Sequence, residues 1–258
     1  MSASDIVALV RTPAKAEELG VEVRVADYAR SDTLEAALQG SDTLLLISGN
    51  EIGQRASQHA NVIAAAQENN VKRIVYTSLL HADRSPLSLA PEHLQTESDL
   101  KSSGIAYTLL RNGWYSENYT GSIAPALGLG AFYGSAGEGR IASAARADYA
   151  DAAVVVLTSE GHEGKTYKLA GDSAYTLSDL AAEISARTGK NIPYRNIPEA
   201  AYAAALKQAG LPESFADAIA SRDVGASQGA LFDDGRQLPT LTGKPTMPLI
   251  ESVKAALA

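Results

Sequence analysis

Short apolar runs alternate with amphipathic stretches along most of the chain. Each run ends at a glycine, a proline or a polar cluster, which is typical of buried strands. The stretches between them carry helix boundaries such as Gly20, Gly40 and Pro91. This alternation predicts an α/β fold with a parallel sheet and helices on both of its faces. The predicted strands are residues 6–10, 21–25, 43–47, 74–76, 105–110 and 166–170, and the predicted helices between them are residues 14–19, 31–39, 53–69, 92–102 and 148–158.

The pattern loosens after Gly130, where a glycine-rich connection covers residues 134–139. Helix patterns then dominate, and one further strand, residues 192–197, interrupts them. The later part of the chain is therefore predicted to be a smaller, mostly helical cover. The helices predicted there are residues 177–188, 199–208 and 213–220.

Composition narrows the classes of partner. The net charge is −8 and no long basic cluster is present, so nucleic-acid binding is not expected. The chain has no cysteine, which excludes disulfides, thiolate metal sites and a cysteine nucleophile. No apolar run has the length of a membrane span, and we expect a soluble, cytoplasmic protein. No metal site is expected, because the four histidines lack ligand spacing: they are His59, His81, His93 and His162.

The densest group of polar and aromatic residues directly follows the predicted strand 105–110. It contains the only tryptophan, and it reads Arg111-Asn112-Gly113-Trp114-Tyr115-Ser116-Glu117-Asn118-Tyr119. Ligands of open α/β sheets bind at the carboxyl ends of the strands, so the stretch suits a binding pocket. A wide surface turn whose tryptophan caps the core explains the same residues equally well.

Other predicted strands also end in residues that suit a ligand. Arg11 follows the first strand, where a dinucleotide-binding sheet would place the adenosine ribose, and an arginine there suits a 2′-phosphate. Ser48 and Ser78 end two later strands and would allow close approach to the backbone. Each residue alone is explained as well or better by a surface arginine, a cap or a turn. Their succession is what favours a ligand site.

Two further motifs are weaker. The series Gly134-x-x-Gly137-x-Gly139 does not open a helix, so we interpret it as a turn and not as a phosphate loop. Ser78, His81 and Asp83 are the residue types of a hydrolase triad, but no Gly-x-Ser-x-Gly elbow surrounds the serine. Neither motif is taken as a site.

Several long motifs together resemble the NmrA-like atypical short-chain dehydrogenases, and within them the bacterial NAD(P)H:quinone oxidoreductase 2 type. The resemblance covers nearly the whole chain. Its motifs are Val10-Arg11-Thr12-Pro13-x-Lys15-Ala16, Leu46-Ile47-Ser48 with Glu51-x-Gly53-Gln54-Arg55, Tyr76-Thr77-Ser78-Leu79-Leu80-His81-Ala82-Asp83, the Arg111 to Tyr119 stretch, Ala145-Arg146-Ala147-Asp148-Tyr149-Ala150, Leu169-Ala170-Gly171-Asp172 and Asp223-Val224-Gly225-Ala226-Ser227.

The resemblance implies a Rossmann-like doubly wound parallel sheet in residues 1–171 and a smaller substrate-covering domain in residues 172–258. Residues 113–130 would reach into the cleft between them. It implies NADPH as cofactor, a quinone as substrate and, as an option, a homodimer.

The resemblance also implies the cofactor contacts, whereas no catalytic residue is identified. Arg11 would meet the 2′-phosphate of NADP, and the loops at Ser48 and Ser78 would flank the cofactor. The loop from Asn112 to Asn118 would lie near the nicotinamide. The other implied cofactor contacts are Asn112, Gly113, Trp114, Tyr115, Ser116, Glu117, Asn118 and Arg146. Trp114 and Tyr115 are also candidates to wall the quinone.

The chain departs from the family pattern in two ways. The family's first strand and its glycine-rich phosphate loop have no counterpart, so we hypothesise a truncated or mis-started form that binds cofactor weakly. Loss of that first strand would expose the edges of two neighbouring strands. The usual Tyr-x-x-x-Lys pair is also absent, and the corresponding helix carries His93 and Glu97. A quinone needs no phenol proton donor, so this absence favours quinone over alcohol chemistry.

The sequence thus leaves three hypotheses for function. The first is NADPH-dependent reduction of quinones by direct hydride transfer. The second is a non-catalytic NAD(P)-binding redox sensor of the NmrA type. The third is an inactive truncated form.

Overall fold

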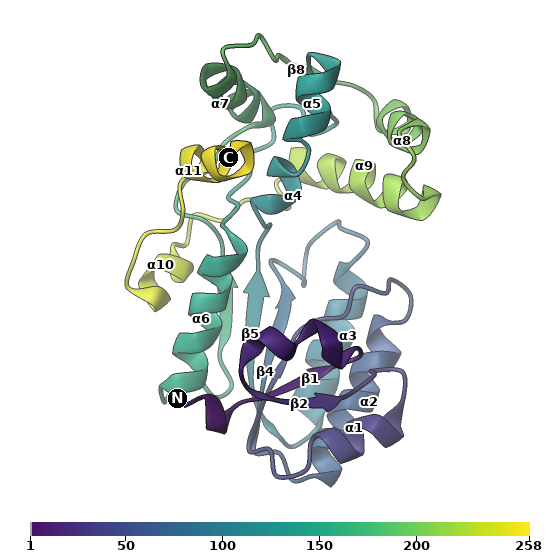
Figure 1. Ribbon diagram of the computed structural model, residues 1–258, viewed down its shortest axis with the longest axis vertical. Coiled ribbons are helices and arrows are strands. Elements are labelled where there is room, and N and C mark those ends of the chain that lie inside the picture. Colours follow the sequence, from purple (N-terminus) through teal and green to yellow (C-terminus); the bar gives the residue numbers. More distant parts are fainter. Residues whose placement is uncertain (1) are drawn as a thin grey trace. The chain divides into compact units, whose positions relative to one another are not determined.

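The computed structural model describes residues 2–258, and they form two compact units whose segments interleave along the chain (Figure 1). The first unit comprises the residues up to Ser78, Pro91–Leu110 and Val154–Thr166. The second comprises Leu79–Ala90, Arg111–Ala153 and Tyr167–Ala258. The division into domains after residue 171 stays a prediction.

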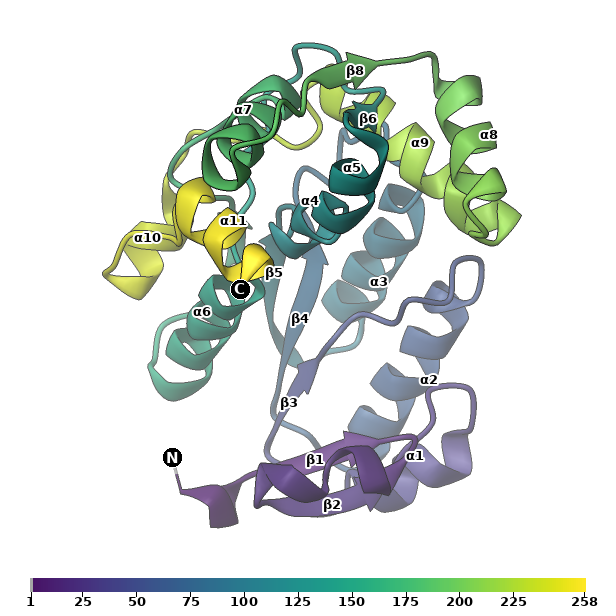
Figure 2. The same cartoon turned by 45° about the horizontal axis from the view of Figure 1, so that its top comes forward.

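Two sheets with parallel strands form the framework of the first unit. Strand β1 (Val7–Val10) pairs in parallel with β2 (Glu22–Val25), and the two lie side by side (Figure 2). Strand β3 (Thr43–Leu46) pairs in parallel with β4 (Arg73–Leu79). The strand order β3-β4-β5-β7 adds β5 (Ala106–Asn112) and β7 (Thr166–Leu169), whose residues from Arg111 and from Tyr167 onward belong to the second unit. The predicted α/β fold with parallel strands is confirmed.

Both β1 and β3 are edge strands within the described residues, because each has a strand neighbour on one side only. The apolar side chains of β1 are half-buried, and Ile47, just after β3, is 60% exposed. An edge strand leaves backbone N–H and C=O groups free to pair. The expected pair of strand edges is therefore present in the first unit.

Helices α1 (Ser31–Ala37), α2 (Arg55–Glu68) and α3 (Ala90–Ser102) cover this framework. Their apolar faces pack on the strands in a core that includes Leu34, Leu46, Val62, Ile74, Tyr76 and Leu109. The α-helix predicted for residues 14–19 is wrong. Two 3₁₀ turns, Pro13–Lys15 and Glu17–Leu19, stand there instead. Gly20 ends the second turn in the left-handed conformation (φ 67°), which leaves too few residues for a stable α-helix.

Helices dominate the second unit, as the sequence predicts for the later part of the chain. Helix α7 (Leu177–Thr188) has a capping box formed by Thr176 and Asp179, and Gly189 ends it. The two short strands β6 (Phe132–Gly134) and β8 (Tyr194–Asn196) pair in parallel. The other elements are α4 (Glu117–Thr120), α5 (Ile123–Leu129), β6 (Phe132–Gly134), α6 (Arg146–Thr158, whose last turn belongs to the first unit), β8 (Tyr194–Asn196), α8 (Glu199–Gln208), α9 (Glu213–Ser227), α10 (Gln237–Thr242) and α11 (Leu249–Leu257).

The glycine-rich connection serves close packing. A Cβ at Gly134 would lie 2.7 Å from the Asp223 carboxylate, and one at Gly139 would lie 2.5 Å from the carbonyl oxygen of Ala226. Both distances are too short for any other residue type, so the glycines let this segment approach α9. No helix in residues 2–258 combines the length and the apolar character that a membrane crossing requires.

Candidate functional site

A hollow opens in the first unit where β1, β2 and β3 lead into their loops. Its volume is about 160 Å³. Arg11 stands at the end of β1, Tyr28 follows β2, and Gly49 to Glu51 follow β3. The residues that line it are Leu9, Arg11, Ala26, Asp27, Tyr28, Gly49, Asn50, Glu51 and Gln58. The strand ends that the sequence singled out at Arg11 and beside Ser48 therefore contribute to one hollow.

Two charged groups of this hollow, those of Arg11 and Glu51, are paired with one another. Arg11 Nη1 donates to Glu51 Oε1 at 2.7 Å. The other carboxylate oxygen of Glu51 accepts a hydrogen bond from the Gln58 amide at 2.8 Å. The Arg11 side chain is 61% exposed and that of Glu51 is 44% exposed. Because solvent reaches both groups, the guanidinium is available to an incoming anion.

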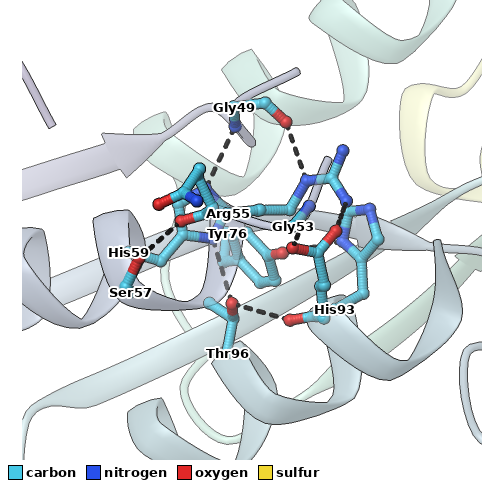
Figure 3. Close-up of polar contacts among 10 residues, drawn as sticks. Gly49, Gly53, Arg55, Ser57, His59, Tyr76, His93 and Thr96 are labelled. Carbon is cyan, nitrogen blue, oxygen red and sulfur yellow. Dashed lines mark hydrogen bonds and ion pairs between the residues drawn. The ribbon is translucent and has the colours of Figure 1, made fainter. Parts of the chain in front are cut away.

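The backbone of Gly49 is held on both sides by buried side chains of α2 (Figure 3). Its N–H donates to Nε2 of His59 at 3.0 Å, and its carbonyl oxygen accepts from Nε of Arg55 at 2.7 Å. A Cβ on Gly49 would come within 3.3 Å of the Gln58 side chain. These contacts fix the peptide from which one wall of the hollow is built.

His59 is a neutral acceptor in this arrangement. Since the Gly49 N–H is a donor, Nε2 of His59 carries no proton, and its Nδ1–H donates to the Thr96 hydroxyl at 3.0 Å. That hydroxyl in turn donates to the carbonyl oxygen of Glu92. Burial, together with the nearby charge of Arg55, lowers the pKa of His59 to about 4. The chain of hydrogen bonds from the loop to α3 is therefore intact at neutral pH.

Arg55 and Glu92 form a second ion pair behind the hollow. Their side chains are 5% and 16% exposed, and Nη1 of Arg55 lies 2.8 Å from the Glu92 carboxylate. Glu92 also accepts a hydrogen bond from the Gly53 N–H at 3.0 Å. Figure 3 shows Arg55 beside Gly49 and Gly53, and the bonds of Gly49 to Arg55 and of Gly53 to Glu92 tie the loop after β3 to α2 and α3.

The two predicted serines differ in their surroundings. Ser48 is half-buried, and its N–H donates to the Thr77 hydroxyl at 2.9 Å. Ser78 is buried, and its hydroxyl donates to the Glu97 carboxylate at 2.6 Å. Ser48 thus adjoins the hollow through Gly49, whereas the Ser78 hydroxyl is turned to a side chain of α3.

The residues at which the sequence lacks the Tyr-x-x-x-Lys pair are buried in the first unit. His93 Nδ1 and the Tyr76 hydroxyl are 2.7 Å apart. Burial, with smaller effects of the Arg55 and His59 charges, lowers the pKa of His93 to about 3. Burial also raises the pKa of the Tyr76 hydroxyl. Both groups are therefore neutral at ordinary pH.

In the second unit, the loop after β5 begins at two backbone hydrogen bonds. Leu80 N–H donates to the carbonyl oxygen of Asn112 at 2.8 Å, and Gly113 N–H donates to that of Leu169 at 2.7 Å. A Cβ at Gly113 would lie 2.9 Å from the same Leu169 oxygen and 3.0 Å from the Tyr149 hydroxyl. Position 113 therefore requires glycine for the loop to lie this close to its neighbours.

Three predicted site residues gather around a fourth, Arg146, which begins α6. Its guanidinium lies over the Tyr115 ring, 4.1 Å from the ring centroid, and its Nη2 donates to the Asn118 side chain at 3.3 Å. Its backbone N–H donates to the Glu117 carboxylate at 3.0 Å. Segments about 30 residues apart in the sequence thus form one partly exposed polar and aromatic cluster.

Trp114 and Ser116 face the interior of the second unit. Trp114 is 8% exposed, the Arg222 guanidinium lies 4.6 Å from its ring centroid, and its indole N–H has no hydrogen-bond partner within residues 2–258. The Ser116 and Ser143 hydroxyls are 2.9 Å apart, and Ser143 is 2.8 Å from the Tyr175 hydroxyl. The tryptophan of the stretch is therefore buried, whereas Tyr115 and Asn118 are half-buried, and the binding pocket stays a prediction.

The hydrolase alternative finds no support in the contacts. The Ser78 hydroxyl donates to Glu97, Asp83 pairs with Arg111 at 2.8 Å, and His81 Nε2 lies 3.0 Å from the carbonyl oxygen of Phe232. These contacts thus join neither His81 to Ser78 nor Asp83 to His81, as a triad would require.

Sequence reasoning gave no role to several residues of these sites. Glu51 stood only in a motif, although its distance from the end of β3 is the signal that could have marked it. Gln58 and Arg222 sit on helices and show no local signal, because only the folded chain brings them to Glu51 and Trp114.

Known proteins closely resemble this chain. The sequence profile of the NAD(P)H-binding family matches residues 2–160. Over 254 residues the chain is 60% identical to quinone oxidoreductase 2 of Escherichia coli (strain K12), which covers 97% of this chain and 89% of that protein.

Solved structures agree with the sequence match. The crystal structure of the Escherichia coli NADPH-dependent quinone oxidoreductase complexed with NADPH has a TM-score of 0.97 at 58% identity, covering 100% of this chain and 92% of that one. The Citrobacter sp. triphenylmethane reductase complexed with NADP(H) has a TM-score of 0.94 at 38% identity, covering 99% and 92%. The chain therefore belongs to the NAD(P)H-binding family of Rossmann-like proteins.

Proposed function

We propose that this protein catalyses the NADPH-dependent reduction of quinones by direct hydride transfer. The observation that carries the proposal is the 60% identity to quinone oxidoreductase 2 over 97% of the chain. The reaction balances as NADPH, a proton and a quinone giving NADP⁺ and the hydroquinone. It needs no covalent intermediate with the protein.

The residues of the first unit fit the adenosine end of NADPH. Pockets that hold a whole small molecule measure about 300–1,000 Å³, so a hollow of about 160 Å³ suits one end of a dinucleotide. The exposed Arg11 guanidinium offers a forked donor that matches a 2′-phosphate. Gly49, held by His59 and Arg55, leaves room for a ligand beside the backbone.

The proposed contacts for the nicotinamide end lie in the second unit, and the family resemblance supports them. They are the loop from Asn112 to Asn118 and Arg146. The Arg146 guanidinium, held over Tyr115 and bonded to Asn118, would orient a ligand through polar and aromatic contacts. The protein's contribution is then binding and positioning.

When bound, NADPH supplies the hydride, which is one proton with two electrons, that reduces the quinone. The chain needs no strong acid of its own for this reaction, because hydroquinone oxygens take protons from water. The neutral, buried states of His93 and Tyr76 agree with that role, since neither is placed to deliver a proton to solvent-exposed groups. They instead bond to each other inside the first unit.

The test is the consumption of NADPH, followed by its absorbance, when a benzoquinone or naphthoquinone is added to the purified protein. We expect steady turnover, and a slower rate with NADPH deuterated at the transferred position. Saturable NADPH binding without turnover would instead indicate the sensor hypothesis, and the absence of binding would indicate an inactive form.

A homodimer and a cytoplasmic location also belong to this proposal, and the family resemblance and the cysteine-free composition support them. Light scattering coupled to size exclusion measures the first. Fractionation of cells that produce the protein tests the second.

A further inference from the structure

The only carboxylate within 4 Å of the Arg11 guanidinium in residues 2–258 is that of Glu51. Both residues line the same hollow, and their side-chain atoms are 2.7 Å apart. The second oxygen of Glu51 is held by the Gln58 amide at 2.8 Å. Glu51 therefore occupies the Nη1 donor of the guanidinium, and each of its own two oxygens accepts a hydrogen bond.

A carboxylate on a guanidinium uses the same donors that a phosphate would use. Arginine binds carboxylates and phosphates through the same planar fork of N–H groups. A 2′-phosphate that reaches Arg11 must therefore displace the Glu51 carboxylate or bind beside a second negative charge. A free 2′-hydroxyl has the opposite relation to Glu51, because it can donate a hydrogen bond to a carboxylate.

We propose that Glu51 sets the cofactor preference of this site by competing with the 2′-phosphate for Arg11. The inference rests on the proposed binding of NADPH at this hollow. In the free protein Glu51 stands in for the phosphate, and it weakens the advantage of NADPH over NADH. Glu51 is then a specificity residue: its charge is opposite to that of Arg11, and it lowers the preference for NADPH that Arg11 raises.

The 2′-phosphate can replace the Glu51 carboxylate because the ion pair is exposed and the backbone beside it is held in place. An ion pair between side chains that are 61% and 44% exposed is weak and readily broken. Two residues before Glu51, the Gly49 peptide is held through both its N–H and its carbonyl oxygen. The carboxylate therefore leaves Arg11 by rotation of its side chain, while the wall of the hollow keeps its shape.

The test measures fragments of the cofactor, so that it does not depend on turnover. Wild type and Glu51→Gln are titrated calorimetrically with 2′,5′-ADP and with 5′-AMP, which differ by the 2′-phosphate. We expect Glu51→Gln to bind 2′,5′-ADP about threefold to tenfold more tightly, the range expected on removing one exposed ion pair and one like charge. Binding of 5′-AMP should not become tighter.

Two further variants make the test specific. Glu68→Gln, an exposed glutamate at the end of α2, makes the same change in net charge and should leave both affinities as in wild type. In an Arg11→Gln background the gain from Glu51→Gln should shrink, because no cation is left to release. An equal gain in that background would mean general repulsion and would overturn competition for Arg11.

The outcomes separate this inference from the proposed function. If wild type prefers 2′,5′-ADP and Glu51→Gln, shown to be folded by its melting curve, has the same affinity, the inference alone is wrong. If neither wild type nor Glu51→Gln binds 2′,5′-ADP more tightly than 5′-AMP, Arg11 does not contact the 2′-phosphate and the inference is overturned with that assignment. A fragment effect without quinone turnover would support the role of Glu51 and leave only the proposed reaction refuted.

Discussion

Two arginine–carboxylate pairs of the first unit have nearly the same length and opposite surroundings. Arg11 and Glu51 are 2.7 Å apart with side chains 61% and 44% exposed. Arg55 and Glu92 are 2.8 Å apart with side chains 5% and 16% exposed. The exposed pair lines the hollow, and the buried pair lies behind the loop from which that hollow is built.

Because they differ in exposure, the two ion pairs differ in how much they stabilise the fold. An exposed pair contributes about 0–1 kcal/mol, so a ligand can replace it at little cost. Breaking one partner of a buried pair leaves an uncompensated charge and costs about 3–5 kcal/mol. A ligand can thus replace Glu51 on Arg11, whereas the Arg55–Glu92 pair that holds the loop must stay intact.

The largest effect is expected from breaking the buried pair. Arg55→Met removes the partner of Glu92 and the donor to the Gly49 carbonyl, and it should lower the free energy of unfolding by about 3–5 kcal/mol. Urea denaturation of wild type and variant measures this change. NADPH affinity should fall as well, because one wall of the hollow loses its support.

The matched control for this substitution is Arg30→Met. Arg30 pairs with Asp32 at 2.6 Å, but both side chains are exposed, at 64% and 67%. Its loss should leave the free energy of unfolding near the wild-type value. Equal losses for Arg55→Met and Arg30→Met would refute the distinction between buried and exposed pairs.

Acid should weaken the same buried framework without any substitution. His59 and His93 are neutral when folded, with pKa values lowered to about 4 and about 3 by burial first. The unfolded chain protonates them near pH 6.5. Below that pH the unfolded state binds more protons, so the free energy of unfolding falls as the pH falls.

The slope identifies the groups responsible. Each histidine contributes about 1.4 kcal/mol per pH unit below its unfolded pKa, until its folded pKa is reached. The free energy of unfolding, measured with urea at several pH values between 6.5 and 5, should therefore fall as the pH falls. In His93→Gln the slope of this fall should be smaller by about one proton per molecule. An unchanged slope in that variant would remove His93 from the explanation.

The framework was partly visible in the sequence, and the reason is the range of the interactions involved. The apolar runs predicted the strands because burial on both faces depends on local composition, and Arg11 was found because it directly follows a strand. The Arg11–Glu51 pair spans 40 residues, and the His59–Thr96 bond spans 37. No local pattern indicates contacts of that range.

The same reason applies to the second unit. The cluster of Tyr115, Glu117 and Asn118 followed from their density in one stretch, while the contact with Arg146 came from the family resemblance. The stacking of Arg222 on Trp114 joins positions with no common motif. The helix wrongly predicted for residues 14–19 fails for a local reason, because Pro13 and Gly20 leave room only for single turns.

The smallest effect on stability, and a large one on selectivity, is expected from the exposed pair. Arg11→Gln should change the free energy of unfolding by less than about 0.5 kcal/mol, as do most surface substitutions. It should weaken NADPH binding about tenfold or more, the value of a charged hydrogen bond lost while Glu51 remains beside the phosphate. NADH binding should stay within about twofold of wild type, because its ribose carries no 2′-phosphate for the guanidinium to recognise.

This substitution completes the comparison only when both quantities are measured on one sample. Melting curves report stability, and titration with NADPH and NADH reports selectivity, with Arg30→Gln as the control for loss of an exposed arginine. If Arg11→Gln destabilised the protein as much as Arg55→Met, the exposed pair would be part of the framework and not a replaceable contact. If it left the NADPH preference intact, the recognition of the 2′-phosphate would have to lie elsewhere. If the exposed pair is replaceable and the buried pair holds the loop, Arg11→Gln must keep its stability and lose its preference for NADPH over NADH.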